Sequence, residues 1–318
     1  MESITKYLIT PIGSLYIFKT LCSFAYKIIK PKEKIINQRE FKKLNNVKTK
    51  NITEDYGGNS EENKKYIFVI NIDELHKEEG SSFLSIGNIK HDNSNFEHIS
   101  NIIDFVILNV KPEEEIILNI DSPGGSVIEY FYVYNQLKRL KDKGYTLNIF
   151  IKKMAASGGY LLACLGNITA TNDSQIGSIG VYSGSFNYHE LIKFLKIGYK
   201  LYKSGDYKNL GDPFEVPTKE GDKKLQDDVT NIHKRFKKVI FENRKDLDMD
   251  KISNADVWFG DEAKDLGLVD NIGTINDYLI EKAKDYTIYE INYHQENKSA
   301  SVNWLNLILG HYFSYYRL

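Results

Sequence analysis

Two stretches of this chain join an apolar strand to a glycine-containing turn and a helix. The first runs from Glu115–Ile120 into Ser122-Pro123-Gly124-Gly125, and the second from Thr146–Ile151 into Ala155-Ala156-Ser157-Gly158-Gly159. The start of a helix leaves N–H groups unpaired and carries a positive dipole end, so each turn offers backbone donors. The glycines beside Ser157 leave room for a substrate carbonyl. We therefore predict two backbone arms that meet at one pocket, with Ser157 as a candidate nucleophile.

Strand-like and helical segments alternate between residues 66 and 292. The further predicted strands are Tyr66–Ile72, Ile168–Thr171 and Tyr199–Tyr202. The predicted helices are Phe96–Val110, Ser126–Lys143, Tyr160–Leu165, Leu191–Leu195, Thr218–Asn243, Ala263–Leu266 and Ile275–Lys284. Ser126 and Glu129 have the spacing of an S-x-x-E capping box at the start of their helix. This alternation predicts an α/β fold with a mostly parallel sheet built from right-handed β-α-β units.

Composition narrows the classes of function. The chain has 318 residues, of which 42% are hydrophobic, so it can bury a sizeable core. Its formal net charge of −1 gives no global indication of nucleic-acid binding. The two cysteines, Cys22 and Cys164, lie in unlike contexts, which excludes a disulfide framework. Cys164 falls within an apolar run, and we expect it to be a buried thiol of the core.

The chain divides into four segments by composition. Residues 1–29 are hydrophobic, but the uncharged run Tyr7–Phe18 is shorter than the roughly 20 residues of a spanning helix. Four interpretations of this segment stay open: a signal-like segment, an interfacial helix, a marginal anchor, or a helix packed on the body. Residues 30–64 predict a charged linker, and residues 65–292 form the globular domain. The aromatic tail, residues 293–318, suits a membrane-interface helix, an oligomer contact or a packed tail.

A nucleophilic serine needs a base. None of the seven histidines lies in a recognisable turn beside the end of an apolar strand, which disfavours a Ser-His-Asp triad. Lysine is the other side chain that can activate a serine. Lys208 follows a predicted strand and a turn and has apolar and aromatic neighbours, as expected of a desolvated base. From composition alone, an ordinary surface lysine in a loop is the alternative.

Taken together, these motifs resemble the signal peptide peptidase A family of Ser/Lys serine proteases, peptidase family S49, and within it the SohB-like branch. The resemblance covers about residues 66 to 285. It rests on motifs in family order and at family-like spacing: Ser122-Pro123-Gly124-Gly125, Ala155-Ala156-Ser157-Gly158-Gly159-Tyr160, Gly177-Ser178-Ile179-Gly180-Val181, Gly205-Asp206-Tyr207-Lys208, Trp258-Phe259-Gly260 with Ala263, and Gly267-Leu268-Val269-Asp270. Any one of these motifs is weak evidence, whereas all of them in register are strong evidence.

The resemblance implies a ClpP/crotonase-like fold and hydrolysis of hydrophobic peptides, such as signal-peptide remnants or membrane-protein segments. Ser157 would be the nucleophile, Lys208 the general base and Ser178 the residue that positions the lysine. Backbone N–H groups of Gly158 and of Gly124 or Gly125 would form the oxyanion hole, with Gly125 preferred. No metal or cofactor is expected.

The expected partners are a peptide substrate and further copies of the chain. The motifs occur once, which in such a family indicates a homo-oligomer, a tetramer or larger ring. Two arrangements of the dyad stay open: Lys208 reaches Ser157 of its own chain, or it reaches the Ser157 of the next subunit. We expect association with a membrane on an unassigned side; a soluble or organellar form stays open. Two other functions also stay open: a crotonase-like enzyme acting on acyl-thioesters, and a catalytically silent membrane scaffold or binding protein.

Overall fold

The computed structural model describes residues 41–42, 44, 46–59, 65–73 and 94–293. Residues 1–29 and the tail that follows residue 293, for which the sequence analysis considers membrane or oligomer contacts, lie outside this set. Among the described residues, no helix combines the length and the apolar character that crossing a membrane requires.

Within the described residues, nine strands form one sheet in the order β1-β9-β2-β3-β4-β5-β8, with β6 pairing β4 and β7 pairing β6. The strands are β1 (Val47–Asn51), β2 (Lys65–Asp73), β3 (Glu115–Ser122), β4 (Leu147–Ala156), β5 (Asn167–Ala170), β6 (Gln175–Gly177), β7 (Val257–Phe259), β8 (Asn271–Ile272) and β9 (Tyr286–Tyr293). Only the β1–β9 and β6–β7 pairs of these strands are antiparallel. The predicted mostly parallel α/β sheet is confirmed.

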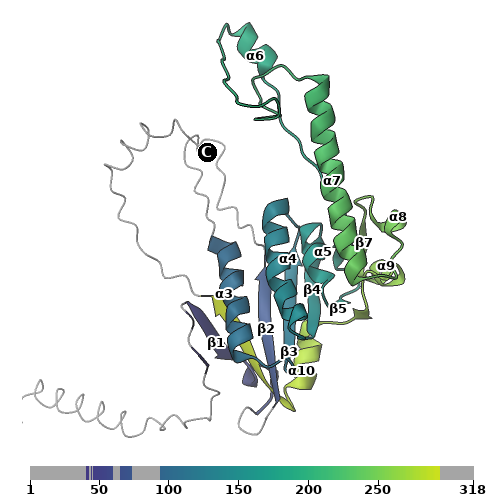
Figure 1. Ribbon diagram of the computed structural model, residues 1–318. Helices are drawn as coiled ribbons and strands as arrows, with labels where there is room; N and C mark the ends of the chain where they lie inside the picture. The colour runs from purple at the N-terminus through teal and green to yellow at the C-terminus, as the bar shows by residue number, and fades with distance from the viewer. Residues whose placement is uncertain (1–40, 43, 45, 60–64, 74–93, 294–318) are drawn as a thin grey trace, which may run out of the picture.

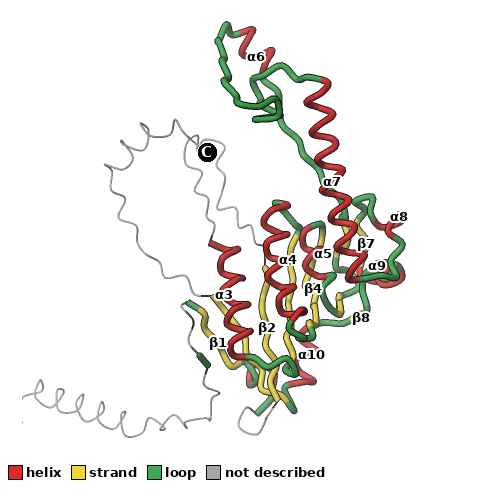
Figure 2. Tube along the Cα trace, in the orientation of Figure 1, coloured by secondary structure: helices red, strands yellow, loops and turns green. Residues whose placement is uncertain are grey.

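Helices cover both faces of this sheet, unequally (Figures 1 and 2). The larger layer consists of α3 (Ser94–Asn109), α4 (Val127–Asp142), α5 (Gly158–Ala163) and the lower part of α7 (Lys219–Asn243). The 3-10 helix η1 (Glu54–Tyr56) and α10 (Ile275–Lys282) cover the opposite face. Among the short helices, α8 (Met249–Ile252) and α9 (Gly260–Asp265) each contribute one buried residue to the larger core, Ile252 and Ala263, whereas α6 (His189–Phe194) buries none.

Strand β3 shows why the sheet has helices on both faces. Ile116 and Leu118 pack into the larger core, whereas Ile117 between them packs into the smaller one, and all three are fully buried. A strand buried on both sides needs a nearly continuous apolar sequence, and β3 has one. The β-α-β connections therefore bring the carboxyl ends of β3 and β4 together, where the two glycine turns lie.

Three local predictions are wrong. The helix after Ser126 forms, but the Ser126 side chain makes no capping hydrogen bond, so the predicted capping box is absent. Tyr199–Tyr202 is a loop and not a strand, because it lies beyond the sheet, where none of the described strands pairs with it. Val47–Asn51, within the predicted linker, forms edge strand β1 on β9: Val47 is buried while Lys48 and Lys50 face outward.

Beyond the sheet, α7 extends away from the body and carries a protruding segment at its distal end (Figure 1). This segment, residues 182–218, includes α6 and is called the arm below. The helix predicted over Thr218–Asn243 forms, and Thr218 caps it at this end: its hydroxyl accepts from the Gly221 N–H at 3.0 Å. The C-terminal part of α7 packs on the body, where Phe236 and Ile240 are buried.

Candidate active site

Ser157 lies at the junction between β4 and α5. Its backbone has φ 51° and ψ −118°, a conformation that side-chain-bearing residues rarely adopt and that costs about 1–3 kcal/mol. Its N–H donates to the Gly177 carbonyl oxygen at 2.8 Å, which holds the turn in place. A sharp strand-to-helix turn of this kind presents a side-chain hydroxyl at the end of a sheet. Ser157 is half-buried and lines a pocket.

The two glycine turns meet, as predicted. Gly124 has φ +92°, and a Cβ atom placed on it would lie 2.7 Å from the Cβ of Ser157 and 2.8 Å from the nitrogen of Gly158. Such distances leave no room for any side chain, and the positive φ independently favours glycine. The Pro-Gly-Gly turn therefore packs directly against the serine turn.

Two N–H groups at this junction are candidates for the oxyanion hole. The N–H of Gly124 donates to Ser122 Oγ at 3.2 Å and is not available. The N–H groups of Gly125 and Gly158 have no hydrogen-bond partner among the described residues. Both residues line the same pocket as Ser157. The geometry favours Gly125 over Gly124 as the second donor, and the role of both donors stays a prediction.

Ser178 lies next to Ser157. The parallel register pairs Ala156 with Gly177, so the following residues, Ser157 and Ser178, are neighbours beyond the strand ends. Ser178 also has a positive φ of 51°, and its N–H donates to the Asp256 carbonyl at 2.6 Å. This placement is compatible with the predicted role of Ser178 beside the reacting groups.

The structure does not bring Lys208 to Ser157 within one chain. Lys208 is exposed in the arm, and its N–H donates to the Gly205 carbonyl at 3.0 Å. The neighbouring Tyr207 hydroxyl bonds Glu220, in the first turn of α7, at 3.2 Å. Phe236, which lines the pocket of Ser157, lies sixteen residues further along that helix, about 24 Å at 1.5 Å per residue. That separation exceeds the reach of a lysine side chain.

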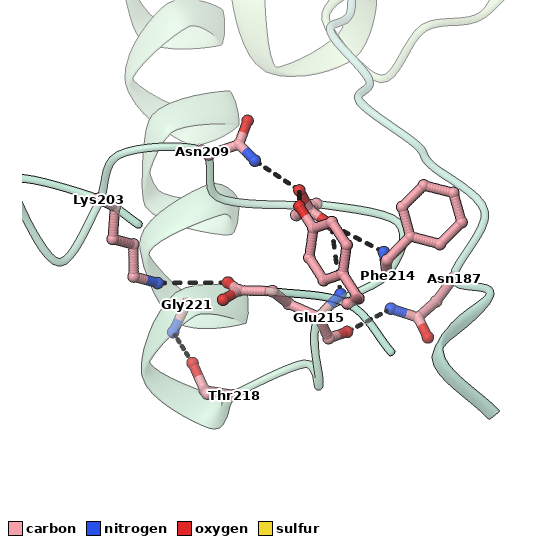
Figure 3. Close-up of polar contacts among 9 residues, drawn as sticks. Asn187, Lys203, Asn209, Phe214, Glu215, Thr218 and Gly221 are labelled. Atoms are coloured by element: carbon pink, nitrogen blue, oxygen red, sulfur yellow. Dashed lines mark hydrogen bonds and ion pairs between the residues drawn. The ribbon is translucent and has the colours of Figure 1, made fainter. Parts of the chain in front are cut away.

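Polar contacts give the arm a defined shape (Figure 3). Asn187 Nδ2 donates to the Glu215 carbonyl at 2.9 Å, and Lys203 Nζ lies 3.2 Å from a carboxylate oxygen of Glu215. Asn209, directly after Lys208, donates to Asp212 at 2.6 Å. These contacts link the loop that carries Lys208 to the segment of the arm that leads into α7.

Asp212 is the centre of these contacts. Burial acts to raise its pKa, but hydrogen bonds from Tyr199, from the N–H groups of Phe214 and Glu215, and from Asn209 outweigh that effect and lower the pKa. A charged Asp212 therefore organises the Lys208 loop at neutral pH.

An apolar pocket of about 80 Å³ opens beside Ser157. Side chains from α4, α5 and α7 form most of its wall, namely Val127, Tyr130, Phe131, Leu161, Ile232 and Phe236. The lining includes no charged residue, so the pocket suits an apolar side chain next to the reacting carbonyl. Sequence reasoning missed this pocket: the 3–4 spacing of Ile232 and Phe236 indicates a packed helix face but not what it packs around.

A larger cavity of about 610 Å³ lies at the far end of α5, lined by Lys141, Cys164, Arg244 and Asp270 among others. It is polar and contains an Arg244–Asp270 ion pair with 2.7 Å between the atoms. Cys164 is 1% exposed, and burial raises its pKa to about 12, so it is a core thiol as predicted and not a nucleophile. The described residues contain no group of three His, Cys, Asp or Glu side chains placed to hold a metal ion.

Comparison with known proteins finds matches over much of the chain. The model of peptidase family S49 matches residues 139–288, and the Clp protease model matches residues 83–176. A Haemophilus influenzae protein named "Probable protease SohB" is 39% identical over 189 residues, covering 59% of this chain and 54% of the relative. A Buchnera aphidicola (subsp. Schizaphis graminum) protein of the same name is 35% identical over 224 residues, covering 68% of this chain and 66% of the relative.

The parallel sheet and the two glycine turns at its carboxyl edge define a ClpP/crotonase-like α/β fold. The chain belongs to peptidase family S49 and is SohB-like. Its match spans just over half the length of the first of these relatives.

Proposed function

We propose that this chain is a serine endopeptidase that uses Ser157 to hydrolyse hydrophobic peptides, such as signal-peptide remnants or membrane-protein segments, at or near a membrane. One observation carries the proposal. Ser157 occupies a strained turn between the N–H groups of Gly125 and Gly158 and an apolar pocket. A nucleophile, two donors for a developing oxyanion and a side-chain pocket are the parts that acyl transfer needs.

In the proposed reaction, Ser157 Oγ attacks the peptide carbonyl as a base removes the hydroxyl proton. The carbonyl oxygen becomes an oxyanion, which the Gly125 and Gly158 N–H groups stabilise; removal of one such donor typically costs about 2.7–4 kcal/mol of barrier. The base then protonates the leaving amine, and an acyl-enzyme remains. Water, deprotonated by the same base, hydrolyses the ester and frees Ser157.

We infer that the base is Lys208 of a neighbouring copy, oriented by Ser178. Within one chain the helix length between Glu220 and Phe236 keeps Lys208 from Ser157. The arm also exposes large aromatic side chains, including Phe186, Phe194 and Tyr202 at 77%, 82% and 88%. Exposed apolar surface of this kind is typical of sites that contact another protein or a membrane. Contact between arms in a homo-oligomer, a tetramer or larger ring, would bury it and bring Lys208 to the next subunit.

Labelling with a serine-directed fluorophosphonate probe tests the nucleophile in the full chain. We expect the wild-type protein to be labelled and to cleave a fluorogenic hydrophobic peptide, and Ser157→Ala to do neither. An assembled wild-type chain that is neither labelled nor active contradicts the proposal. That result would favour a crotonase-like acyl-thioester enzyme or a silent membrane scaffold, and hydrolysis of an acyl-thioester separates these two.

Mixing two inactive variants tests the shared site. Lys208→Ala and Lys208→Arg should both be inactive, because arginine cannot give up its proton at working pH. A mixture of Ser157→Ala and Lys208→Ala, unfolded and reassembled together, should regain activity. At equal amounts about one quarter of the sites would combine an intact Ser157 with an intact neighbouring Lys208. Activity of Lys208→Arg contradicts the lysine base; failure of the mixture to regain activity contradicts the shared site.

A further inference from the structure

Two buried hydroxyl groups lie underneath the candidate oxyanion hole. Tyr130, near the start of α4, is 1% exposed, and Ser122, at the end of β3, is fully buried. The two hydroxyl oxygens are 2.6 Å apart. Ser122 Oγ also accepts the Gly124 N–H at 3.2 Å. A continuous chain of hydrogen bonds therefore joins the Tyr130 side chain to the backbone of the Pro-Gly-Gly turn.

The same two residues also contact the serine turn. A Cβ atom on Gly158 would lie 2.4 Å from Cγ of the Tyr130 ring, so the ring rests directly on the Gly158 backbone. A Cβ atom on Gly159 would lie 2.5 Å from the Ser122 carbonyl oxygen and 3.2 Å from Ser122 Cβ. Tyr130 and Ser122 thus contact both backbone arms of the site. The Tyr130 ring packs on the serine turn, and the hydrogen-bonded hydroxyls hold the Pro-Gly-Gly turn.

We propose that Tyr130, acting through Ser122, is a positioning residue that holds the Gly125 and Gly158 N–H groups at the spacing required for an oxyanion. This inference rests on the proposed peptidase function. The bond from Gly124 to Ser122 turns the Gly124 N–H into the protein, and the next N–H, that of Gly125, is left for the substrate. The ring on Gly158 fixes the opposite donor.

Precise positioning of these N–H groups matters because a donor stabilises the oxyanion only at a short and defined distance. Oxyanion donors must lie about 2.7–3.1 Å from the position of the charged oxygen, and a displacement of 1 Å can cost about 100-fold in rate. A glycine-rich turn does not hold such a position by itself, since glycine is the most flexible residue. A fully buried pair of hydroxyls supplies the missing rigidity, because breaking their bonds would leave buried polar groups unsatisfied.

Tyr130→Phe is the sharpest test, since it keeps the ring on Gly158 and removes only the hydroxyl. We expect kcat on a hydrophobic peptide to fall roughly 10- to 100-fold, less than for outright loss of a donor, while KM changes less than about twofold. A peptide aldehyde, whose adduct with Ser157 places an oxyanion in the hole, should lose affinity in parallel with kcat. Titration of active sites with a fluorophosphonate corrects each rate for the folded fraction.

Tyr134→Phe is the matched control. Tyr134 lies one turn further along α4 and is also buried, at 5%, but its hydroxyl accepts a hydrogen bond from Asn243 at 3.0 Å, away from the site. Its removal should leave kcat unchanged even if it lowers the melting temperature. A loss of kcat in Tyr134→Phe equal to that in Tyr130→Phe would overturn the inference, because any buried tyrosine of α4 would then have the same effect.

A double-mutant cycle tests whether Tyr130 acts through Ser122. Ser122→Ala should lower kcat to a similar extent, and the double variant should be no slower than the slower single variant, since both changes break one chain of bonds. Fully additive losses would overturn this connection. If wild type is active and Tyr130→Phe keeps kcat, only this inference fails. If wild type is inert in peptide hydrolysis and labelling, the proposed function fails and this inference with it.

Discussion

The N–H of Ser157 donates to the carbonyl oxygen of Gly177 at 2.8 Å, one residue beyond the last paired residue of β4. This bond extends the parallel ladder between β4 and β6 into the turn, and the strained conformation of Ser157 is therefore imposed by the sheet. It also makes Ser178 the immediate neighbour of the candidate nucleophile. Strain of this kind persists only where the surrounding structure determines it.

Ser157→Gly should stabilise the protein while it abolishes hydrolysis. Glycine adopts φ 51° and ψ −118° without strain, which removes a cost of about 1–3 kcal/mol from the folded state. Glycine also raises the entropy of the unfolded chain, which offsets about 0.4–1 kcal/mol of that gain. We expect Ser157→Gly to exceed Ser157→Ala by roughly 1 kcal/mol in the free energy of unfolding, measured in urea.

Ser157→Ala serves as the control, because alanine keeps the Cβ atom and hence the strain but removes the hydroxyl. Both variants should be inactive, and neither should be labelled by the fluorophosphonate. Equal stability of the two variants would show that the turn is not strained.

Gly124→Ala and Gly144→Ala separate crowding at the site from backbone strain alone. Both glycines have positive φ, +92° and +87°, but a Cβ on Gly144 meets nothing within 4 Å, whereas one on Gly124 meets Ser157 and Gly158. Gly144→Ala should cost about 1 kcal/mol and leave kcat unchanged. Gly124→Ala should cost about 1–3 kcal/mol more and lower kcat at least roughly 100-fold. Activity close to wild type in Gly124→Ala would contradict the contact between the two turns.

Local sequence patterns predict the core of this fold well. The continuous apolar run of Glu115–Ile120 and the helical spacing of Phe96–Val110 each depend on burial alone, and both elements form as predicted. Tyr199–Tyr202 has the composition of a strand but lies in the arm, where it pairs with none of the strands that the structure describes. A sequence window records the propensity of a segment and not whether a partner strand reaches it.

Part of the candidate site is likewise predictable from the sequence, and part is not. The meeting of the Gly124 turn with the Ser157 turn follows from two parallel strands ending at one edge, so the sequence pattern suffices to predict it. The distance of Lys208 from Ser157 does not follow, because it depends on the length and direction of α7. Tyr130 was also beyond prediction, since nothing in the sequence distinguishes it among 22 tyrosines until its hydroxyl is found 2.6 Å from that of Ser122.

Asp270 should make the stability of the protein depend on acid pH. Burial acts to raise its pKa, but hydrogen bonds from Arg244 and from the Ile168 N–H, at 2.7 Å each, outweigh burial and lower the pKa. A lowered pKa in the folded state means that this stabilisation is complete above the unfolded value, near 3.9, and is lost as the pH falls through the folded value. We expect the free energy of unfolding to decrease from about pH 5 to pH 3.

Asp270→Asn should remove part of that dependence, because asparagine does not titrate. Urea unfolding at pH 7, 5 and 3 would show a smaller free energy at pH 7 and a shallower decrease toward acid than wild type. Asp265→Asn, at an exposed position of α9, is the control and should keep the wild-type slope. An unchanged slope in Asp270→Asn would mean that other carboxyl groups cause the acid sensitivity.

Ile232→Ala should let the enzyme accept a larger substrate side chain next to the cleaved bond. Ile232 is a half-buried pocket residue on α7, so its truncation enlarges a pocket of about 80 Å³ with little risk to folding. We expect kcat/KM for a peptide with phenylalanine at this position to rise roughly tenfold relative to one with alanine, since pocket methylenes contribute about 1–3 kcal/mol. Ile280→Ala, 51% exposed on α10, should leave that ratio unchanged. An unchanged ratio in Ile232→Ala would exclude this pocket as the specificity site.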